Sequence, residues 1–385
     1  MHTRLSIRFR RPQQFAALLL LLLLGQCLWV SDHQTLTERD YDFARCGRET
    51  WEKPTPLAGY YTTCGNIRDG ILAYRAAGLP LTVQRIIAGQ SSDTSTWEMR
   101  HQLSYVLFLL HSLFLLSGLA LGAALWWVTR RLYGNDGGAV ALGLYCLSPA
   151  VVHGMTDPNN EILAAFGLFA SVYLAMGVAH ALQGPARSWR PRIVLLVLAF
   201  GFTAASHAAA FLLALFLALG FMIYLAVGRR APIIPVMMAV VLGSLLLVFA
   251  CYSFNADAFS YYFRSGAARL WLSGDAAQRW ILALPNAAIA IAAAVALLLY
   301  LTSRRSRYFG NTAPLLVAAL LFVLTTPGTF SDPTLWALPF LLAFVGVVFA
   351  DAVEGPRRRV LQAAIGAILL LEAGLSVGSL ALHLF

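Results

Sequence analysis

The chain has 385 residues, of which 59% are hydrophobic and only 12% are charged, and its mean hydropathy is +0.69. Soluble domains carry roughly 25% charged residues, so this composition excludes a soluble globular protein, a disordered chain and a disulfide-rich miniprotein. The apolar runs are continuous rather than short and alternating, which excludes a β-barrel and predicts membrane-spanning helices.

Ten apolar runs follow one another along the chain, and one helical crossing requires about 20 residues. They lie near 15–31, 102–128, 138–155, 160–182, 193–228, 233–253, 280–302, 313–327, 333–350 and 360–384. The run 193–228 is too long for one crossing, and Ser206 and His207 lie where a polar turn can divide it. The sequence therefore predicts an all-α polytopic membrane protein with about eleven transmembrane helices.

The distribution of arginines tests this division. With eleven spans and a cytoplasmic N-terminus, the cytoplasmic segments carry 17 basic and three acidic residues, whereas the outer segments carry 11 basic and 14 acidic residues. The positive-inside rule therefore favours two helices in the long run, with the N-terminus cytoplasmic and the C-terminus outside. The net charge of +10 is then mostly a topology signal, and nothing further supports nucleic acid as a partner.

We expect a single transmembrane domain over residues 1–385. A cytoplasmic tail and the first span occupy 1–31, an outer loop occupies 32–101, and a helical bundle occupies 102–385. The first apolar run is longer than the core of a signal peptide, and no small-residue cleavage site follows it. We therefore interpret this run as an uncleaved anchor.

The outer loop has two signals of its own structure. Cys46 and Cys64 are its only cysteines, on the side where disulfides persist, and we predict that they pair; two free thiols remain the alternative. Residues 66–88 mix apolar and basic side chains, and Gly78 and Pro80 interrupt the pattern. One or two short helices at the membrane surface, or a loop packed on the bundle, fit this segment equally well.

A second outer loop, roughly 254–279, mixes aromatic residues with arginines that include Arg264 and Arg269. Such a mixture is typical of the aromatic belt at the level of lipid headgroups. It also suits a site that binds a lipid phosphate, because arginine can donate two parallel hydrogen bonds to phosphate oxygens.

Three carboxylates, Glu38, Asp40 and Asp42, follow the first span within five residues. Alternate residues of an extended segment share a face, so we expect the three side chains to point together. Converging carboxylates can bind a divalent cation, or one can act as a base while its neighbours raise its pKa. The alternative is a solvated acidic loop that is salt-bridged to nearby arginines.

Asp157 and Glu161 form a second acidic pair, between the third and fourth spans. Asp157 or Asn159 is a candidate cap for the fourth helix, and Glu161 is favourable in its first turn, which explains both acids structurally. His153 lies one turn before Asp157, where it can join an outer site or pack at the interface.

The order of these elements resembles the GT-C superfamily of membrane glycosyltransferases, in particular the family 39 protein-mannosyltransferase and lipid-A aminoarabinosyltransferase-like branch. One span is followed by a long outer loop that opens with Glu38 and Asp40, then by surface helices, and later by Asp157 in a short outer loop. Further likeness lies in the basic turn at Arg130 and the kink at Ser148-Pro149. The likeness covers the organisation of roughly the first 230 residues.

The resemblance implies transfer of a sugar, with inversion, from a polyprenyl-phosphate carrier to a protein, lipid or glycan acceptor. By this analogy Asp40 would deprotonate the acceptor hydroxyl, Glu38 would assist or help to hold a divalent metal, and Asp157 would be the second acid. Arginines of the outer loops would neutralise the carrier phosphate. The further substrate-binding candidates are Asp42, Glu161, His153, His207, Arg264 and Arg269. The expected location is the bacterial inner membrane, with the active face periplasmic or extracellular.

Two departures from the family pattern leave an alternative open. Family members often carry a lysine in the region that here reads Ala204–Ala208, where His207 replaces a cation only when it is protonated. Many also carry an arginine before the span at 333–350, and none stands there in this chain. A non-catalytic membrane subunit on a GT-C-like fold is therefore the alternative. A transporter would show internal repeats, and we find no clear repeat.

Overall fold

The computed structural model describes residues 12–52, 64, 67, 70–88, 103–184, 186–226, 228, 230–267, 287–302, 308–324, 334–355 and 358–382. These residues form helices and their connections, without a β-strand among them. Seven of the helices are long and apolar enough to cross a membrane, and two shorter helices are also apolar. The predicted all-α polytopic membrane protein is therefore confirmed, whereas the side of the membrane that each terminus faces remains a prediction.

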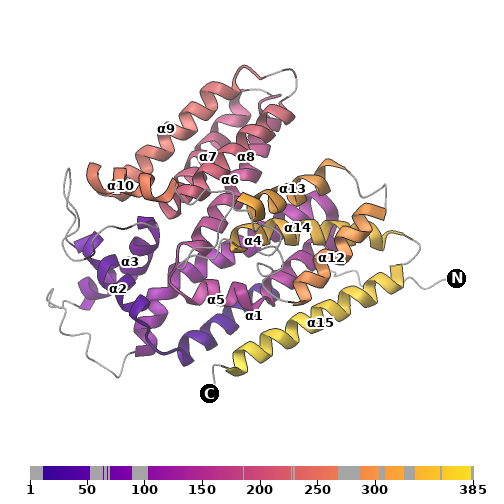
Figure 1. The fold of residues 1–385 in the computed structure, drawn as a ribbon, viewed down its shortest axis with the longest axis horizontal. Helices are drawn as coiled ribbons and strands as arrows, with labels where there is room; N and C mark the ends of the chain where they lie inside the picture. Colours follow the sequence, from indigo (N-terminus) through magenta and orange to yellow (C-terminus); the bar gives the residue numbers. More distant parts are fainter. Residues whose placement is uncertain are drawn as a thin grey trace.

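The helices follow one another along the chain as shown in Figure 1. Their bounds are α1 (Pro12–His33), α2 (Glu38–Glu52), α3 (Ile71–Ala88), α4 (Leu103–Cys146), α5 (Pro149–Thr156), α6 (Glu161–Ala181), α7 (Ala186–Ser206), α8 (Ala208–Leu225), α9 (Ile233–Cys251), α10 (Ala256–Ala267), α12 (Ala287–Thr302), α13 (Phe309–Leu324), α14 (Thr334–Val353) and α15 (Arg358–Leu382).

The division of the long apolar run lies where the sequence places it. α7 ends at Ser206 and α8 begins at Ala208, and the residue between them, His207, has an extended backbone (φ −157°, ψ 122°). The Nδ1 atom of His207 accepts a hydrogen bond from the Ala209 N–H at 3.2 Å, which satisfies one free donor at the start of α8. One polar side chain thus separates two helices in a run without charged residues.

The element α4 contains two helices that meet at a sharp bend. Gly134 has a φ of +88°, a conformation that only glycine adopts readily, and it breaks the 44-residue element between its two parts. The predicted spans 102–128 and 138–155 correspond to these two parts, the second of which is followed, after Ser148, by α5, which begins at Pro149.

The core of the bundle lies around α14. In the apolar stretch of α14, 83% of the residues are buried inside the protein, against 17% in α15. α14 packs against α4, α6 and α13. α14 and the second part of α4 approach closely at Gly346 and Gly137, as small residues allow between helices in a membrane. α15 lies at the edge of the bundle, where Ser376 donates a hydrogen bond of 2.8 Å to Gln26 of α1.

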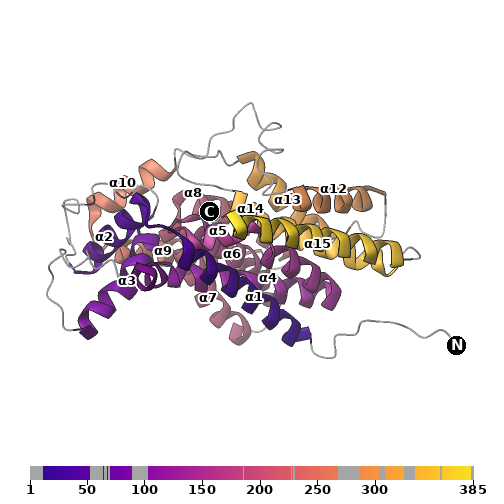
Figure 2. The same cartoon turned by 90° about the horizontal axis from the view of Figure 1, so that it is seen from below.

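α2 and α3 form a helical pair, here called the platform, at the end of the bundle towards which α1 runs (Figures 1 and 2). The two helices cross where Gly47 and Gly78 bring their backbones together. Of the alternatives left open for residues 66–88, the described part shows one helix, α3, over Ile71–Ala88, which contains both Gly78 and Pro80. Gly78 is where α2 crosses, and Pro80 lies inside the helix.

Arg75 of α3 joins the platform to the corner between α9 and α10. Its Nε atom donates to the carbonyl of Cys251, and its Nη2 atom donates to the Ser253 hydroxyl at 2.7 Å. The guanidinium lies 4.7 Å from the ring centroid of Trp51, and the Trp51 indole donates to the Arg75 carbonyl at 2.9 Å. Arg75 therefore connects α2, α3 and the α9–α10 corner through hydrogen bonds and a ring contact.

Candidate active site

The acidic segment after the first span begins a helix. The Thr37 N–H and hydroxyl donate to Asp40 Oδ2 at 2.9 and 2.6 Å, and the Asp40 N–H donates to Thr37 Oγ1 at 3.1 Å. This reciprocal pattern is a capping box that satisfies free donors at the start of α2. The expectation of an extended segment with three carboxylates on one face is therefore wrong. Glu38 and Asp42 are exposed, one helical turn apart, whereas Asp40 is buried.

Asp40 has a partner that the sequence did not reveal. Nε2 of His111, on α4, lies 3.1 Å from Asp40 Oδ1, and both side chains are fully buried. The two residues are 71 positions apart, so no local pattern connects them. This contact fixes the start of α2 to the second transmembrane segment.

The surroundings of Asp40 shift its pKa in two directions. Burial raises this pKa, but the hydrogen bonds from His111 and Thr37 together lower it by more, so it lies below its ordinary value of 3.8. The stability that these bonds contribute is therefore complete above pH values of about 4 and is lost as the pH falls below that value.

We expect the unfolding temperature of the wild type to fall more steeply on acidification below about pH 4 than that of an Asp40→Asn variant, because asparagine does not titrate. Thermal unfolding of the detergent-purified protein across this pH range measures the difference. Two parallel curves would show that Asp40 does not contribute the effect.

Asp157 lies in the short connection between α5 and α6. Gln34, just past the end of α1, donates from Nε2 to Asp157 Oδ1 at 3.2 Å. The side chain of Asn159, rather than that of Asp157, caps α6, because its Oδ1 accepts from the N–H groups of Glu161 and Ile162 at 2.9 and 3.4 Å. Asp157 is thus half-buried and close to the connection that leads into α2.

The other predicted site residues contact different elements. His153 is exposed and its Nε2 lies 3.2 Å from the hydroxyl of Ser379 on α15. His207 is buried, with its ring 4.7 Å from that of Trp336. Arg264 is exposed on α10 and donates to Ser260 of the same helix. Glu161 is buried at the start of α6, and Arg269 lies outside the described residues.

No group of three or more His, Cys, Asp or Glu side chains that could hold a metal ion occurs in the part of the chain that the structure describes. The divalent cation expected at Glu38, Asp40 and Asp42 therefore loses its geometric basis, since Asp40 is buried on a different side of α2 from the exposed Glu38 and Asp42.

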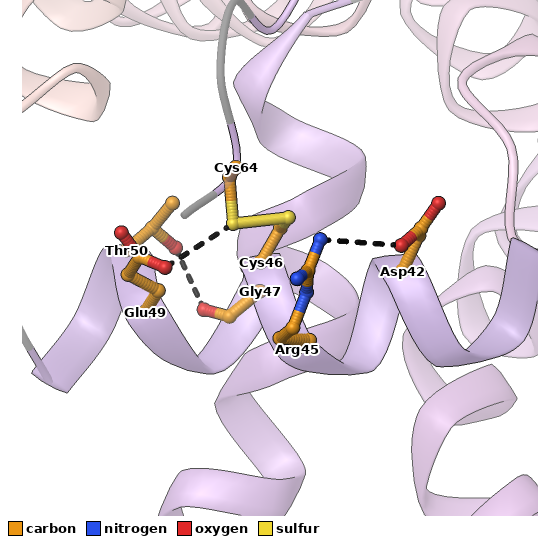
Figure 3. Close-up of a disulfide and its surroundings, with 7 residues drawn as sticks. All are labelled: Asp42, Arg45, Cys46, Gly47, Glu49, Thr50 and Cys64. Atoms are coloured by element: carbon orange, nitrogen blue, oxygen red, sulfur yellow. Dashed lines mark hydrogen bonds and ion pairs between the residues drawn. A yellow bond between two sulfur atoms is a disulfide. The ribbon is translucent and has the colours of Figure 1, made fainter. Parts of the chain in front are cut away.

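Cys46 on α2 and Cys64 form a disulfide across 18 positions, which is the pairing expected from the sequence. Figure 3 shows the disulfide with Glu49 and Thr50 beside it and the ion pair of Arg45 with Asp42 further along the helix. The bond ties the segment after α2 back onto the middle of that helix.

Replacing both cysteines by serine is expected to cost about 3 kcal/mol of unfolding free energy, because a closed loop of this size restricts the unfolded chain. Thermal unfolding in detergent checks the loss, and a reducing agent should lower the stability of the wild type by a similar amount. A reducing agent that also destabilises the double variant would mean that its effect does not come from this bond.

The polytopic helical bundle of this chain, with its helical platform, has the GT-C fold of the solved structures that it matches. No protein-family model and no curated protein match the chain by sequence. Solved structures do match it. ArnT from Cupriavidus metallidurans in the apo state aligns with a TM-score of 0.66 at 14% identity, over 96% of this chain and 76% of ArnT.

The archaeal oligosaccharyltransferase AglB from Archaeoglobus fulgidus, solved with an inhibitory peptide and a dolichol-phosphate, aligns with a TM-score of 0.54 at 13% identity. The alignment covers 95% of this chain but only 55% of AglB. These proteins are membrane glycosyltransferases of the GT-C fold, so the predicted resemblance to that superfamily is confirmed for the fold.

Proposed function

We propose that this protein is an integral membrane glycosyltransferase that moves a sugar, with inversion, from a polyprenyl-phosphate carrier to an acceptor at the platform end of the bundle. The fold shared with ArnT and AglB supports the class of reaction, and the dolichol-phosphate bound to AglB supports a lipid-phosphate carrier. The proposed location is the bacterial inner membrane, with this end periplasmic.

The observation that carries the proposal is the position of Asp157. It is a half-buried carboxylate at the platform end, bonded to Gln34 at 3.2 Å and close to the connection into α2. Transfer to a hydroxyl requires a nearby base, and departure of a carrier phosphate requires cations. Arg264 is exposed on α10 and forms bonds within its own helix, so it can turn towards a phosphate.

A non-catalytic subunit on the same fold is the second candidate, and one observation favours it. Asp40, the base expected from the resemblance, has no exposed surface and is bonded to His111 and Thr37. A protein that kept the fold and lost the reaction would retain such an anchor.

An assay with the purified protein separates the two candidates. Lipids extracted from a strain that lacks the gene contain the unused donor. The purified protein, without any other protein, is reconstituted with these lipids, and outer-face material of the same strain is added as the source of acceptor. The enzyme is expected to consume a glycosylated lipid and release its carrier phosphate, as followed by mass spectrometry. Two results together would refute the proposal. The protein would leave the lipid profile unchanged, and the outer-face glycans would be the same in cells with and without the gene.

A further inference from the structure

The two acids of the platform end differ in what their oxygen atoms contact. In Asp40, Oδ2 accepts from the N–H and the hydroxyl of Thr37, at 2.9 and 2.6 Å, and Oδ1 lies 3.1 Å from His111 Nε2. None of the Asp40 side chain is exposed. A general base must come within hydrogen-bond reach of the proton that it takes. Asp40 presents no surface at which a hydroxyl can make that contact.

His111 holds one oxygen atom of Asp40 in this arrangement. His111 Nδ1 is buried and has no hydrogen-bond partner among the described residues. With a proton on Nε2 the ring donates to Asp40 Oδ1. Both carboxylate oxygens of Asp40 are therefore engaged, one by His111 and the other by Thr37.

Asp157 has the opposite arrangement. Only Oδ1 is bonded, to Gln34 Nε2, and Oδ2 has no hydrogen-bond partner within the described ranges. Its backbone is extended (φ −96°, ψ 129°), and its N–H donates to the His153 carbonyl at 2.9 Å, which fixes the side chain at the end of α5. Asp157 is half-buried, so an acceptor hydroxyl can approach Oδ2 from the accessible side.

Gln34 supplies a second acceptor at the same place. Its Oε1 atom is buried and has no partner in the described part of the chain, although its Nε2 atom is bonded to Asp157. A buried polar atom of a native protein usually has a partner, such as a water molecule or a ligand. An ordered water molecule beside Asp157 would satisfy this atom.

From these contacts we infer that Asp157 is the carboxylate that takes the acceptor proton, and that Asp40 and His111 are an anchor that fixes the start of α2. The inference rests on the proposed function. In the step, the acceptor oxygen forms a bond to the anomeric carbon and its proton passes to Asp157 Oδ2. The bond between that carbon and the carrier phosphate oxygen breaks, and the phosphate leaves with the electron pair.

The test compares variants in a strain that lacks the gene, with the wild-type-dependent product quantified by mass spectrometry and unfolding temperatures measured on purified protein. Asp157→Asn is expected to lower product formation at least about 100-fold, the usual scale of a lost general base, at an unchanged unfolding temperature. Asp40→Asn is expected to lower the unfolding temperature and to keep product formation within about tenfold of the wild type when assayed below that temperature.

His111→Gln is the second anchor variant, because it keeps the Asp40 carboxylate and offers it an amide donor. We expect a lower unfolding temperature and product formation within about tenfold of the wild type. Normal transfer by Asp157→Asn, or loss of transfer by His111→Gln or Asp40→Asn at an unchanged unfolding temperature, would overturn the inference. If the wild type forms no product, the proposed function is wrong and the inference falls with it. If the wild type forms the product and Asp157→Asn forms it equally well, only the inference is wrong.

Discussion

A Gly78→Ala variant is expected to lose about 3 kcal/mol of unfolding free energy, the upper range for overpacking of a tight contact. A Cβ atom at this position would lie 2.1 Å from the carbonyl carbon of Gly47 and 2.2 Å from its oxygen. Both atoms belong to the backbone of α2, so no side chain can turn away to make room. The two helices of the platform must separate, and thermal unfolding in detergent measures the cost.

Gly25→Ala, on α1, is the matched control. A Cβ atom there meets no other atom within 4 Å, so the same substitution in a helix should be neutral or stabilise by about 0.5–1 kcal/mol. Equal stability changes in both variants would mean that the close crossing of α2 and α3 does not limit the stability of the protein.

The second large effect is expected for Glu52→Ala, at about 3–5 kcal/mol, the range for breaking a mostly buried ion pair by removing one partner. Glu52 binds Arg48 within α2 at 3.1 Å and Arg85 of α3 at 2.7 Å. The three side chains are only 10–19% exposed, so the substitution removes the carboxylate that both arginines share in a poorly hydrated place. Thermal unfolding compared with the wild type gives the loss.

An ion pair on the exposed side of the same helix provides the comparison. Asp42 lies 3.4 Å from Arg45, but the two side chains are 60% and 42% exposed, and water screens their attraction. Asp42→Ala should therefore change stability by roughly 0.2–1 kcal/mol at most. A loss as large as that of Glu52→Ala would show that exposure does not separate the two pairs.

Much of the fold could be predicted because a membrane imposes simple rules on a sequence. The length of each apolar run limits the number of crossings, and the arginines required the run 193–228 to contain two helices, which meet at His207. The pairing of Cys46 with Cys64 followed from their being the only cysteines in one outer loop. These predictions needed only local composition.

The candidate site was less predictable, for two different reasons. The capping box of Thr37 and Asp40 was present in the sequence as a threonine followed three positions later by an acid, and the expected extended segment overlooked it. The contacts of Asp40 with His111 and of Asp157 with Gln34 join residues 71 and 123 positions apart. Such contacts depend on how the helices pack, and no spacing rule describes them.

Arg75 has a mechanical consequence for the entry of any lipid between the platform and α10. Its bonds to the Cys251 carbonyl and the Ser253 hydroxyl cross from α3 to the α9–α10 corner. A sideways opening at this edge must either break both bonds or carry the corner along with α3. Any motion that keeps both bonds therefore moves the platform and the α9–α10 corner together.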